Sequence, residues 1–528
     1  MKNILLLITF CFLTASLKAQ SPVIDWARSF PSGRTLAPQC MASFPGNGIL
    51  VAGYTNIPYP ANQVALLAVD SSGNLLWRDS ITSVGTGSAI LHLRGLASLP
   101  DGTSYVTGTF KGQLTCSGTV LNQVGTGYHE IFLVKFSAAG SLLWMKTFYG
   151  ISPFPTGIVS DGSGNLVMAT DIDTLNIQGS GFSARGSHDL LVVKMDPEAN
   201  VIWSKQFSGD VFGKGLTVCS DGRTAVMGNF GDTLFFDSSS FTHQDNGSWE
   251  SDEFLIYLDA NGQIDKLNIS TLGILDPTHI IPHDDKLLLS AVTAWHDCAS
   301  AYQLVDENAT GLWSTRLPEG GTDYGDCFMY ENIASADHDR FWAFGNGKKV
   351  IDYGAGTYNA ALRLVQFDFA GNIISSDTFD LPDGPSLSNA AAAGSSGSNL
   401  YFAAVYYDTL KLQSHTLYSA SGEMVLFKMR SPFASAISTN DLPAAIAVRL
   451  YPNPATNQVT IISTMQQEVS VEIYDVLGKL LKKQDVTLAP GSTVLPLELS
   501  SGVFPLRICN SKTGRLICSD KLLIVEAH

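Results

Sequence analysis

The most reactive side-chain neighbourhoods in this chain are two places where a histidine stands beside an acidic residue. They are Trp295-His296-Asp297-Cys298 and His283-Asp284-Asp285, which both fall in one irregular part of the sequence. Imidazole and carboxylate groups held together can line a pocket or ligate a metal ion. Isolated His–Asp neighbours are more typical of surface loops, so an exposed loop is the simpler interpretation of both segments.

Patterns that normally carry catalysis are missing from the chain. Tyr128-His129-Glu130-Ile131 is no His-Glu-x-x-His motif and leads directly into an apolar run. Gly394-Ser395-Ser396-Gly397 has loop composition and is no nucleophile elbow. Asp171-Ile172-Asp173 is too short to enclose a calcium ion alone. The sequence therefore assigns no catalytic residue, no cofactor-binding residue and no metal ligand, and it predicts no cofactor.

The elements that would position any site are β-strands that recur along the chain. The phrases ALLAVDSSGNLLWRDSI (65–81), IFLVKFSAAGSLLWMKTF (131–148) and DLLVVKMDPEANVIWSKQF (189–207) share one plan. An apolar, β-forming run meets a turn with Gly or Asn, and a second run centred on Trp follows. Short alternating runs around such a turn predict β-hairpins. Asp70–Trp77 resembles the Asp-box of sialidases but has one residue too many between Asp and Gly, so a hairpin turn is preferred.

A second recurring phrase lies between the hairpins and begins with turn residues before a strand rich in small side chains. Its seven copies are GNGILVAGY (46–54), DGTSYVTGTF (101–110), DGSGNLVMATDI (161–172), DGRTAVMGNF (221–230), DDKLLLSAV (284–292), DHDRFWAFGNG (337–347) and SGSNLYFAAVYY (397–407). Gly and Ala in these strands would let neighbouring strands approach closely. An all-strand repeat of this size predicts a β-propeller.

The arrangement of the chain ends predicts that the propeller is closed. The last first-arm strand, MVLFKM (424–429), has no second arm after it, whereas VIDWARSF (23–30) is a second arm with no first arm before it. If these two segments pair, the ring hides the open edges of its sheet. We therefore expect a seven-bladed propeller over residues 21–430. An open β-solenoid or a row of sandwiches is the alternative.

The repeat is similar to the bacterial SBBP-type β-propeller repeat, most clearly over residues 109–150. That family has an acidic residue before an apolar strand, and Glu130, Asp189 and Glu253 occupy this place. The resemblance implies a shape and does not imply an activity.

The ends and the overall charge constrain location and partners. Residues 1–20, with Lys2 before an apolar stretch and small residues near Ala19, read as a signal peptide, and we expect no transmembrane segment. Net charge is −16, which argues against nucleic acid and against docking on an anionic membrane. Seven cysteines follow the signal, an odd number; Cys509 and Cys518 could face each other across a hairpin.

After a linker at 431–446, residues 447–528 have the composition of a small all-β domain. The segment closely resembles the type A C-terminal sorting domain of type IX secretion cargo. The resemblance is carried by Tyr451-Pro452-Asn453-Pro454, Ile473-Tyr474-Asp475 with Gly478-Lys479, Ser501-Gly502 with Arg507-Ile508, and Lys521–Val525. It implies an Ig-like sandwich, the type IX secretion machinery as a partner, and a final location outside the cell or on its outer-membrane surface.

These observations lead to an expectation about function that is broader than the expectation about fold. We expect a secreted or surface-displayed, non-catalytic binding or adhesion module with a glycan or protein ligand on the propeller. An extracellular polysaccharide hydrolase or lyase, which would need paired carboxylates, and a structural part of a surface assembly are the alternatives. The phrase Asp-Thr-Leu at 173–175, 232–234 and 408–410 resembles a bacterial O-glycosylation acceptor, and it is also a plausible strand start.

Overall fold

The computed structural model describes most of the chain between residues 23 and 524. The described residues are 23–30, 36–55, 62–84, 91–125, 129–151, 153–161, 163–231, 233–242, 252–269, 277–283, 286–293, 299–306, 308, 310–316, 327–334, 340–352, 357–368, 371–381, 391–396, 399–430, 449–451, 458–463, 467–474, 480–488, 491–497, 499, 502–511 and 516–524. The expected signal peptide (1–20) and linker (431–446) lie outside them. The chain divides into two compact units, Met1–Pro432 and Phe433–His528.

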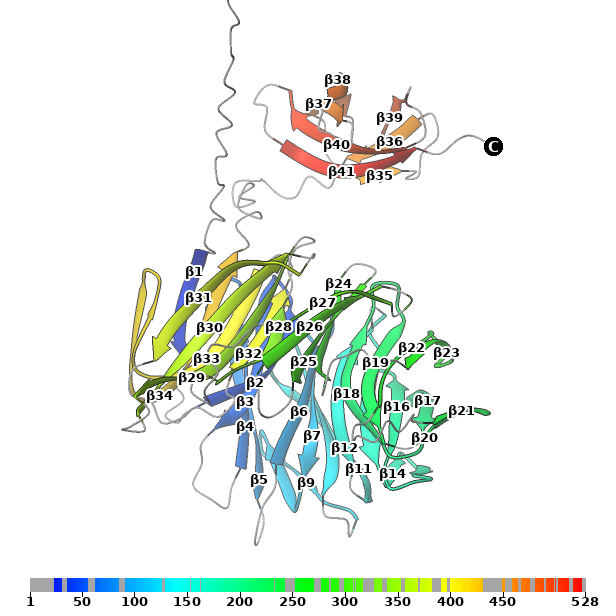
Figure 1. The fold of residues 1–528 in the computed structure, drawn as a ribbon, viewed down its shortest axis with the longest axis vertical. Helices are drawn as coiled ribbons and strands as arrows, with labels where there is room; N and C mark the ends of the chain where they lie inside the picture. The colour runs from blue at the N-terminus through cyan, green and yellow to red at the C-terminus, as the bar shows by residue number, and fades with distance from the viewer. Residues whose placement is uncertain are drawn as a thin grey trace, which may run out of the picture. The chain divides into compact units, whose positions relative to one another are not determined.

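The first unit is built from antiparallel sheets of four principal strands, which we call blades and number along the chain (Figure 1). Blade 1 contains β2(Leu36–Phe44), β3(Gly48–Thr55), β4(Asn62–Val69) and β5(Leu75–Val84), and blade 2 contains β6(Leu91–Ser98), β7(Ser104–Phe110), β10(Glu130–Phe136) and β11(Leu142–Ile151). Blade 3 contains β12(Phe154–Ser160), β13(Leu166–Ile172), β16(Asp189–Met195) and β17(Val201–Phe207), and blade 4 contains β18(Val211–Val218), β19(Thr224–Phe230), β22(Asp252–Leu258) and β23(Ile264–Ile269). Blade 5 contains β24(Pro277–His283), β25(Lys286–Thr293), β26(Ala299–Val305) and β27(Gly311–Arg316), and blade 6 contains β28(Cys327–Ala334), β29(Arg340–Asp352), β30(Thr357–Asp368) and β31(Ile373–Leu381). Blade 7 contains β32(Ala391–Ser396), β33(Asn399–Leu412), β34(His415–Arg430) and β1(Val23–Phe30).

The blades form a closed ring around an axis. Their first strands touch in an unbroken series in which β2 contacts β6, β6 contacts β12, β12 contacts β18, β18 contacts β24, β24 contacts β28, β28 contacts β32, and β32 contacts β2. The closing blade joins the two ends of the unit, because β1 pairs antiparallel with β34 and sets Ala27 opposite Phe427 (Figure 1). The expected all-β, propeller-like ring completed by the N-terminal strand is confirmed, and the open alternatives are wrong.

The middle strands of the blades are buried on both faces. Every side chain of β7, β10 and β13 is buried, which explains why β10 and β13 are largely apolar and why none of the three shows a polar–apolar alternation. Burial of these strands against both neighbouring blades produces a separate hydrophobic cluster between each pair of adjacent blades.

Each recurring Trp fastens its blade to the next one. Trp77 Nε1 donates a hydrogen bond to the carbonyl oxygen of Ala138 at 3.0 Å, and Trp203 Nε1 donates to that of Ala260 at 2.9 Å. Both acceptors lie in the turn between the third and fourth strands of the following blade. We call this contact the tryptophan latch. It explains why a turn and a Trp recur together along the sequence.

The turn beneath the latch requires glycine. Gly140 and Gly262 have φ of +79° and +78°, a region that favours glycine, and a Cβ atom there would lie 2.4 and 2.6 Å from the Trp ring of the preceding blade. The ring and the turn therefore fit only when the turn residue carries no side chain.

Short hairpins protect the outer edges of the blades. They are β8(Gln113–Cys116) with β9(Thr119–Asn122), β14(Thr174–Ile177) with β15(Ser180–Ser183), and β20(Thr233–Phe236) with β21(Ser239–Thr242). Each is inserted between the second and third strands of one blade and adds to the outermost strand of the preceding blade: β8 pairs with β5, β14 pairs with β11, and Phe235 bridges to Ser208 at the end of β17. Covering an edge in this way removes a site for unwanted strand pairing.

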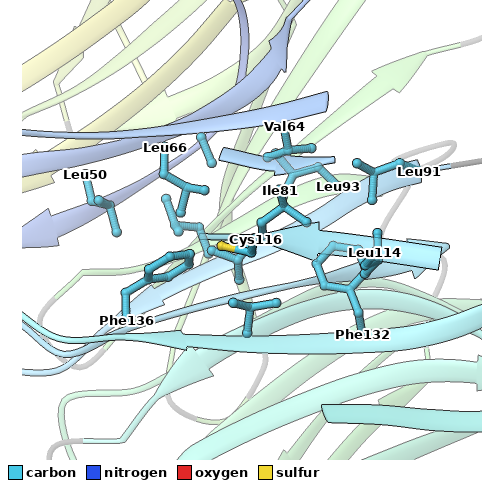
Figure 2. Close-up of a cluster of buried hydrophobic side chains, with 14 of the residues drawn as sticks. Leu50, Val64, Leu66, Ile81, Leu91, Leu93, Leu114, Cys116, Phe132 and Phe136 are labelled. Carbon is cyan, nitrogen blue, oxygen red and sulfur yellow. The ribbon is translucent and has the colours of Figure 1, made fainter. Parts of the chain in front are cut away.

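The first of these hairpins contributes side chains to the core between blades 1 and 2. Figure 2 shows Leu114 and Cys116 from β8 among Val64 and Ile81 of blade 1 and Phe132 of blade 2. All five side chains are buried. The hairpin is therefore part of the packing between two blades. Of the Asp-Thr-Leu phrases, Thr174-Leu175 and Thr233-Leu234 begin outer hairpin strands, whereas Asp408–Leu410 lies within β33.

The second unit is a two-sheet all-β domain. One sheet contains β35(Arg449–Tyr451), β36(Gln458–Ser463) and β39(Gly491–Pro496), and the other contains β38(Leu480–Leu488), β37(Gln467–Tyr474), β40(Gly502–Asn510) and β41(Leu516–Ile524). In the β40–β41 hairpin, Cys518 stands opposite Ile508 and Cys509 opposite Leu516. The two cysteines expected to face each other are therefore not direct cross-strand partners.

The described residues include no helix that is long and apolar enough to cross a membrane.

Candidate binding site on the axis of the ring

A series of β-bulges surrounds the axis at one level. Six first strands carry one extra residue opposite the second strand, and in the five of blades 1 to 5 these residues are Gln39, Arg94, Thr156, Lys214 and Thr278. All five are polar, and none of them is fully buried. Because bulges redirect a side chain, the ring places a polar residue from each of five consecutive blades near its axis. No feature of the sequence marked these residues as equivalent.

The small residues of the second strand make room for these bulges. A Cβ atom on Gly108 would lie 1.9 Å from the carbonyl oxygen of His92, and one on Gly53 would lie 2.2 Å from that of Ala37. In these two blades the close approach of the first strand therefore requires glycine in the second strand. This confirms the expectation that small residues permit close strand approach.

Arg94 is the most unusual member of the series. Its guanidinium carbon lies 3.6 Å from the ring centroid of Phe154, the first residue of β12 in the next blade. Its Nε is buried and has no hydrogen-bond partner, and no carboxylate pairs with Arg94 in the described part of the chain. Burial lowers the pKa of Arg94, but a guanidinium remains charged at neutral pH. Arg94 is thus a cation without a matching anion.

The nearest acid in electrostatic contact with Arg94 is Asp171 at the end of β13. Burial raises the pKa of this carboxyl from its ordinary 3.8 to about 7, although Lys214 and Arg94 oppose the change. Its Oδ1 accepts a hydrogen bond from the Gly213 backbone N–H at 2.8 Å. Near neutral pH a large fraction of Asp171 is therefore uncharged, and it cannot fully balance the arginine.

The other titratable groups nearby do not supply negative charge. Burial, followed by the charge of Arg94, lowers the pKa of His92, and burial together with His92 and Arg94 lowers that of His129. Burial raises the pKa of the Cys40 thiol to about 12, so the thiol stays protonated and is a poor nucleophile. The cluster of Arg94, Phe154, Asp171 and the Gly213 N–H, which we call the axial arginine site, is therefore cationic in a protein of net charge −16.

Three buried acids stand at the start of a third strand, and the hydrogen bonds of Glu130 and Asp189 show structural roles. Glu130 accepts hydrogen bonds from the backbone N–H groups of Val124 (2.9 Å) and Gly125 and from the Thr147 hydroxyl (2.7 Å). Val124 and Gly125 belong to the connection before β10, and Thr147 belongs to the neighbouring strand β11.

Asp189 repeats the arrangement in the next blade. It accepts from the backbone N–H groups of Arg185 and Gly209 at 3.1 and 3.2 Å and from Gln206 Nε2 at 2.6 Å. The equivalent Glu253 is buried too. Committed to backbone donors, Glu130 and Asp189 hold loops in place and are poorly suited to proton transfer.

One His–Asp pair occurs where the sequence gave no signal. His188 Nδ1 lies 2.7 Å from Asp173 Oδ1, and the His188 ring packs on that of Phe212, with 5.2 Å between centroids. The adjacent Ser187 hydroxyl bonds to Asp210 Oδ1 at 2.5 Å and not to the histidine. The geometry therefore provides an oriented imidazole but no nucleophilic triad.

A pocket of about 410 Å³ lies at the other ends of the same first strands, and its lining includes Ser43, Ser98, Ser160 and Ser396. Two of these hydroxyls join neighbouring blades: Ser160 Oγ donates to the Ser98 carbonyl at 3.0 Å and Ser396 Oγ to that of Phe44 at 3.4 Å. These serines act as blade-to-blade ties.

The segments singled out from the sequence do not form a site in the described structure. Trp295-His296-Asp297-Cys298 lies outside the described residues, as do Asp284 and Asp285, and His283 is buried at the end of β24. Asp70 caps its own turn by accepting from the N–H groups of Ser72 and Asn74 at 2.9 and 2.8 Å, which confirms the hairpin interpretation. Among the described residues, no group of three or more His, Cys, Asp and Glu is arranged to hold a metal ion.

Comparison with known families identifies the second unit. Residues 449–524 match the family described as the secretion system C-terminal sorting domain. The chain is a type IX secretion cargo. Its sorting domain directs export to the cell surface or the extracellular space. Within this domain Val459, Ile461, Val471 and Ile473 are core residues. The motif segments Pro452-Asn453-Pro454 and Asp475–Lys479 lie outside the described residues.

Comparisons of the whole cargo chain add no functional assignment. No curated protein matches it. Among solved structures, a protein of unknown function from Bacteroides caccae is 10% identical with a TM-score of 0.35, covering 63% of this chain and 94% of that one. A variant of the Synechocystis apocarotenoid oxygenase is 13% identical with a TM-score of 0.33, covering 55% of this chain and 63% of that one. An ACO/RPE65 chimera is 10% identical with a TM-score of 0.32 and the same coverage. The similarity of the blades to the SBBP-type repeat stays a prediction.

Proposed function

We propose that the ring of this type IX cargo is a non-catalytic binding or adhesion module that presents a ligand site at one end of its axis. The observation that carries the proposal is the different construction of the two ends. At one end the first and second strands join through short turns, such as Gly46–Asn47 and Asp101–Gly102. At the other end the second and third strands join through long connections, which include 111–129 and 173–188. These connections form hairpins that are held against the ring, so this end presents a larger and firmly positioned surface, which is suited to recognition.

The roles of the carboxylates favour binding over turnover. A glycoside hydrolase needs two carboxyl groups at working separation, each free to exchange a proton or attack. Glu130 and Asp189 are instead buried and bonded to backbone donors. The His188–Asp173 pair is the described arrangement best suited to proton transfer, so it defines the alternative hypothesis of a hydrolase or lyase.

The proposal is tested with the mature full-length chain, in a glycan and protein-ligand array run beside turnover assays on the same polysaccharides. We expect retention of a ligand without products. Product formation that disappears in His188→Ala, with Ser187→Ala as the neighbouring control, would establish catalysis and refute the binding module. Retention of neither ligand class, with assembly into a multi-protein surface complex, would favour the structural alternative.

Export is tested separately from binding. A reporter fused to residues 440–528 should reach the medium or cell surface of a host with type IX secretion, and it should stay periplasmic when residues 516–524, which form β41, are removed. β41 pairs along the whole of β40, so its loss removes an edge of the domain.

A further inference from the structure

We propose that the axial arginine site binds an oxyanion group of the ligand, with Arg94 as the anchoring residue. The inference rests on the proposed binding function and deepens it by naming the ligand chemistry: a carboxylate, sulfate or phosphate group carried by an acidic glycan or another anionic molecule.

The first argument is the missing counter-charge. Arg94 is partly enclosed, its Nε is buried without a hydrogen-bond partner, and Asp171, its acidic neighbour, has a carboxyl oxygen taken by the Gly213 N–H. A desolvated cation is costly unless an anion and hydrogen-bond acceptors accompany it. A ligand oxyanion supplies both.

The second argument is the contrast with Arg223, which stands in a similar aromatic setting. Its guanidinium carbon lies 4.7 Å from the ring centroid of Tyr257. Arg223 pairs through Nε with Asp221 at 2.7 Å and through a terminal nitrogen with Asp265 at 2.9 Å. Arg223 thus forms ion pairs with two carboxylates of the chain, whereas Arg94 forms no ion pair with a carboxylate among the described residues.

The third argument is geometric. Stacking on Phe154 uses the flat face of the Arg94 guanidinium and leaves its N–H edge, which is the part that forms paired hydrogen bonds with oxyanions. The bulge that carries Arg94 adjoins those that carry Gln39 and Thr156 in the neighbouring blades. Gln39 and His92 are exposed, so solvent reaches this level of the axis. The Thr156 hydroxyl is buried and unpartnered and offers a further donor.

The experiment measures anion binding to the mature full-length protein by calorimetry and by the shift of the thermal midpoint. The probes are glucuronate, sulfate and phosphate at low ionic strength, with glucose as the neutral control. Glucuronate alone binding would identify a carboxylate ligand, and all three binding would identify a general oxyanion site. Either result supports the proposal if Arg94→Met weakens binding at least tenfold while Arg223→Met changes it less than twofold.

Stability distinguishes a ligand anchor from a structural residue. Without anion, Arg94→Met should unfold at the same temperature as the wild type or higher, because methionine keeps the contact with Phe154 and removes a charge that nothing balances. Arg94→Lys should fold and retain weak binding. A lower midpoint in Arg94→Met that anions do not affect would show a structural role and overturn the proposal.

The failures of the two proposals are distinguishable. If the array finds a ligand whose affinity is the same in Arg94→Met and independent of salt, the binding module stands and the anchor is refuted. The highest anion concentration is about 50 mM, which is roughly 50 times a millimolar dissociation constant and would saturate even a weak site. If none of the three anions binds the wild type at this concentration, the anchor is refuted whatever the array shows.

Discussion

Ala27 and Phe427 are cross-strand partners, although they stand near opposite ends of the ring's sequence. Around them, β1 pairs with β34 from Val23 opposite Arg430 to Phe30 opposite Met424. The pairing turns a row of blades into a ring, and with it the first strands come together around one axis. The axial arginine site is built by three consecutive blades, 2, 3 and 4, and the closure completes the ring around the axis that this site faces.

Removing the closing strand should open the ring. A chain that starts at residue 31 exposes the edge of β34 and loses the side chains of Ile24 and Ala27 from the core. We expect aggregation and a thermal midpoint lower by roughly 10 °C or more, since each kcal/mol lost corresponds to about 2–4 °C in domains of 150–250 residues. Circular dichroism and size-exclusion chromatography measure both. Val23→Ser, at a side chain that is 51% exposed, is the control and should change little.

The tryptophan latch should contribute measurably to stability. Trp203→Ala removes the hydrogen bond to the Ala260 carbonyl and the contact with Gly262, and we expect a loss of about 2–4 kcal/mol in the free energy of unfolding. Trp203→Phe keeps most of the packing and should lose only about 1 kcal/mol. Denaturant unfolding of the two variants checks the order; equal losses would show that packing in the latch is unimportant.

Glu130 should behave as a structural clamp. Glu130→Gln leaves the side chain the same size but makes it a poor acceptor for three donors, so we expect a loss of about 1–3 kcal/mol. Hydrogen exchange at Val124 and Gly125 should accelerate. Asp101→Asn, an exposed turn acid bonded to the Thr103 N–H, is the matched control and should lose less than about 1 kcal/mol. An unaltered exchange rate at Val124 would contradict the clamp.

Asp171 should make stability depend on pH. Its pKa is about 7 in the folded protein and 3.8 ordinarily, so the folded state holds a proton that the unfolded state releases. The free energy of unfolding should therefore fall as pH rises from about 4 to about 7, by roughly 2–4 kcal/mol, and then level off. Asp171→Asn keeps an oxygen for the Gly213 N–H and should remove this slope, being more stable than the wild type at pH 8 and similar at pH 4.

The same residue should affect anion binding at the axial arginine site. Above pH 7, ionised Asp171 competes with a ligand oxyanion for Arg94, so affinity should decrease from pH 6 to pH 8 in the wild type. In Asp171→Asn the affinity should be nearly independent of pH over that range. Calorimetric titration with glucuronate at both pH values measures the difference. A wild-type affinity that rises with pH would mean that Asp171 does not oppose the anion.

The described cysteines should react slowly in the folded protein. Burial raises the pKa of Cys40 and Cys116 to about 12 and that of Cys219 to about 11. At pH 8 the thiolate fraction is then on the order of one in a thousand or less. Alkylation followed by peptide mass spectrometry should show strong protection of all three peptides, which denaturant removes. Rapid labelling of Cys40 would show that the axis is more open than described.

Local patterns determined the type of each element and the closure of the ring. Apolar runs such as those of β10 and β16 could be recognised because both faces of these strands are buried, and the turn at Gly140 could be recognised because few residues tolerate a positive φ. The unmatched arms at 23–30 and 424–429 predicted their own pairing. The sorting domain was recognisable for a related reason, since its motifs are contiguous segments in a fixed order.

The candidate site was decided only by the tertiary structure. A β-bulge is one extra residue in a strand, and one residue more or less in APQC (37–40) or LRGL (93–96) leaves no mark on composition or alternation. Whether an arginine has a counter-ion depends on residues distant in the sequence: Arg94 meets Phe154 and Asp171 of the next blade, while Arg223 meets Asp265 of its own blade. Burial then sets the charge of Asp171. Side-chain contacts and burial are properties of the folded ring. The sequence alone therefore predicted the scaffold and the export route, and the tertiary structure located the candidate site for an anionic ligand.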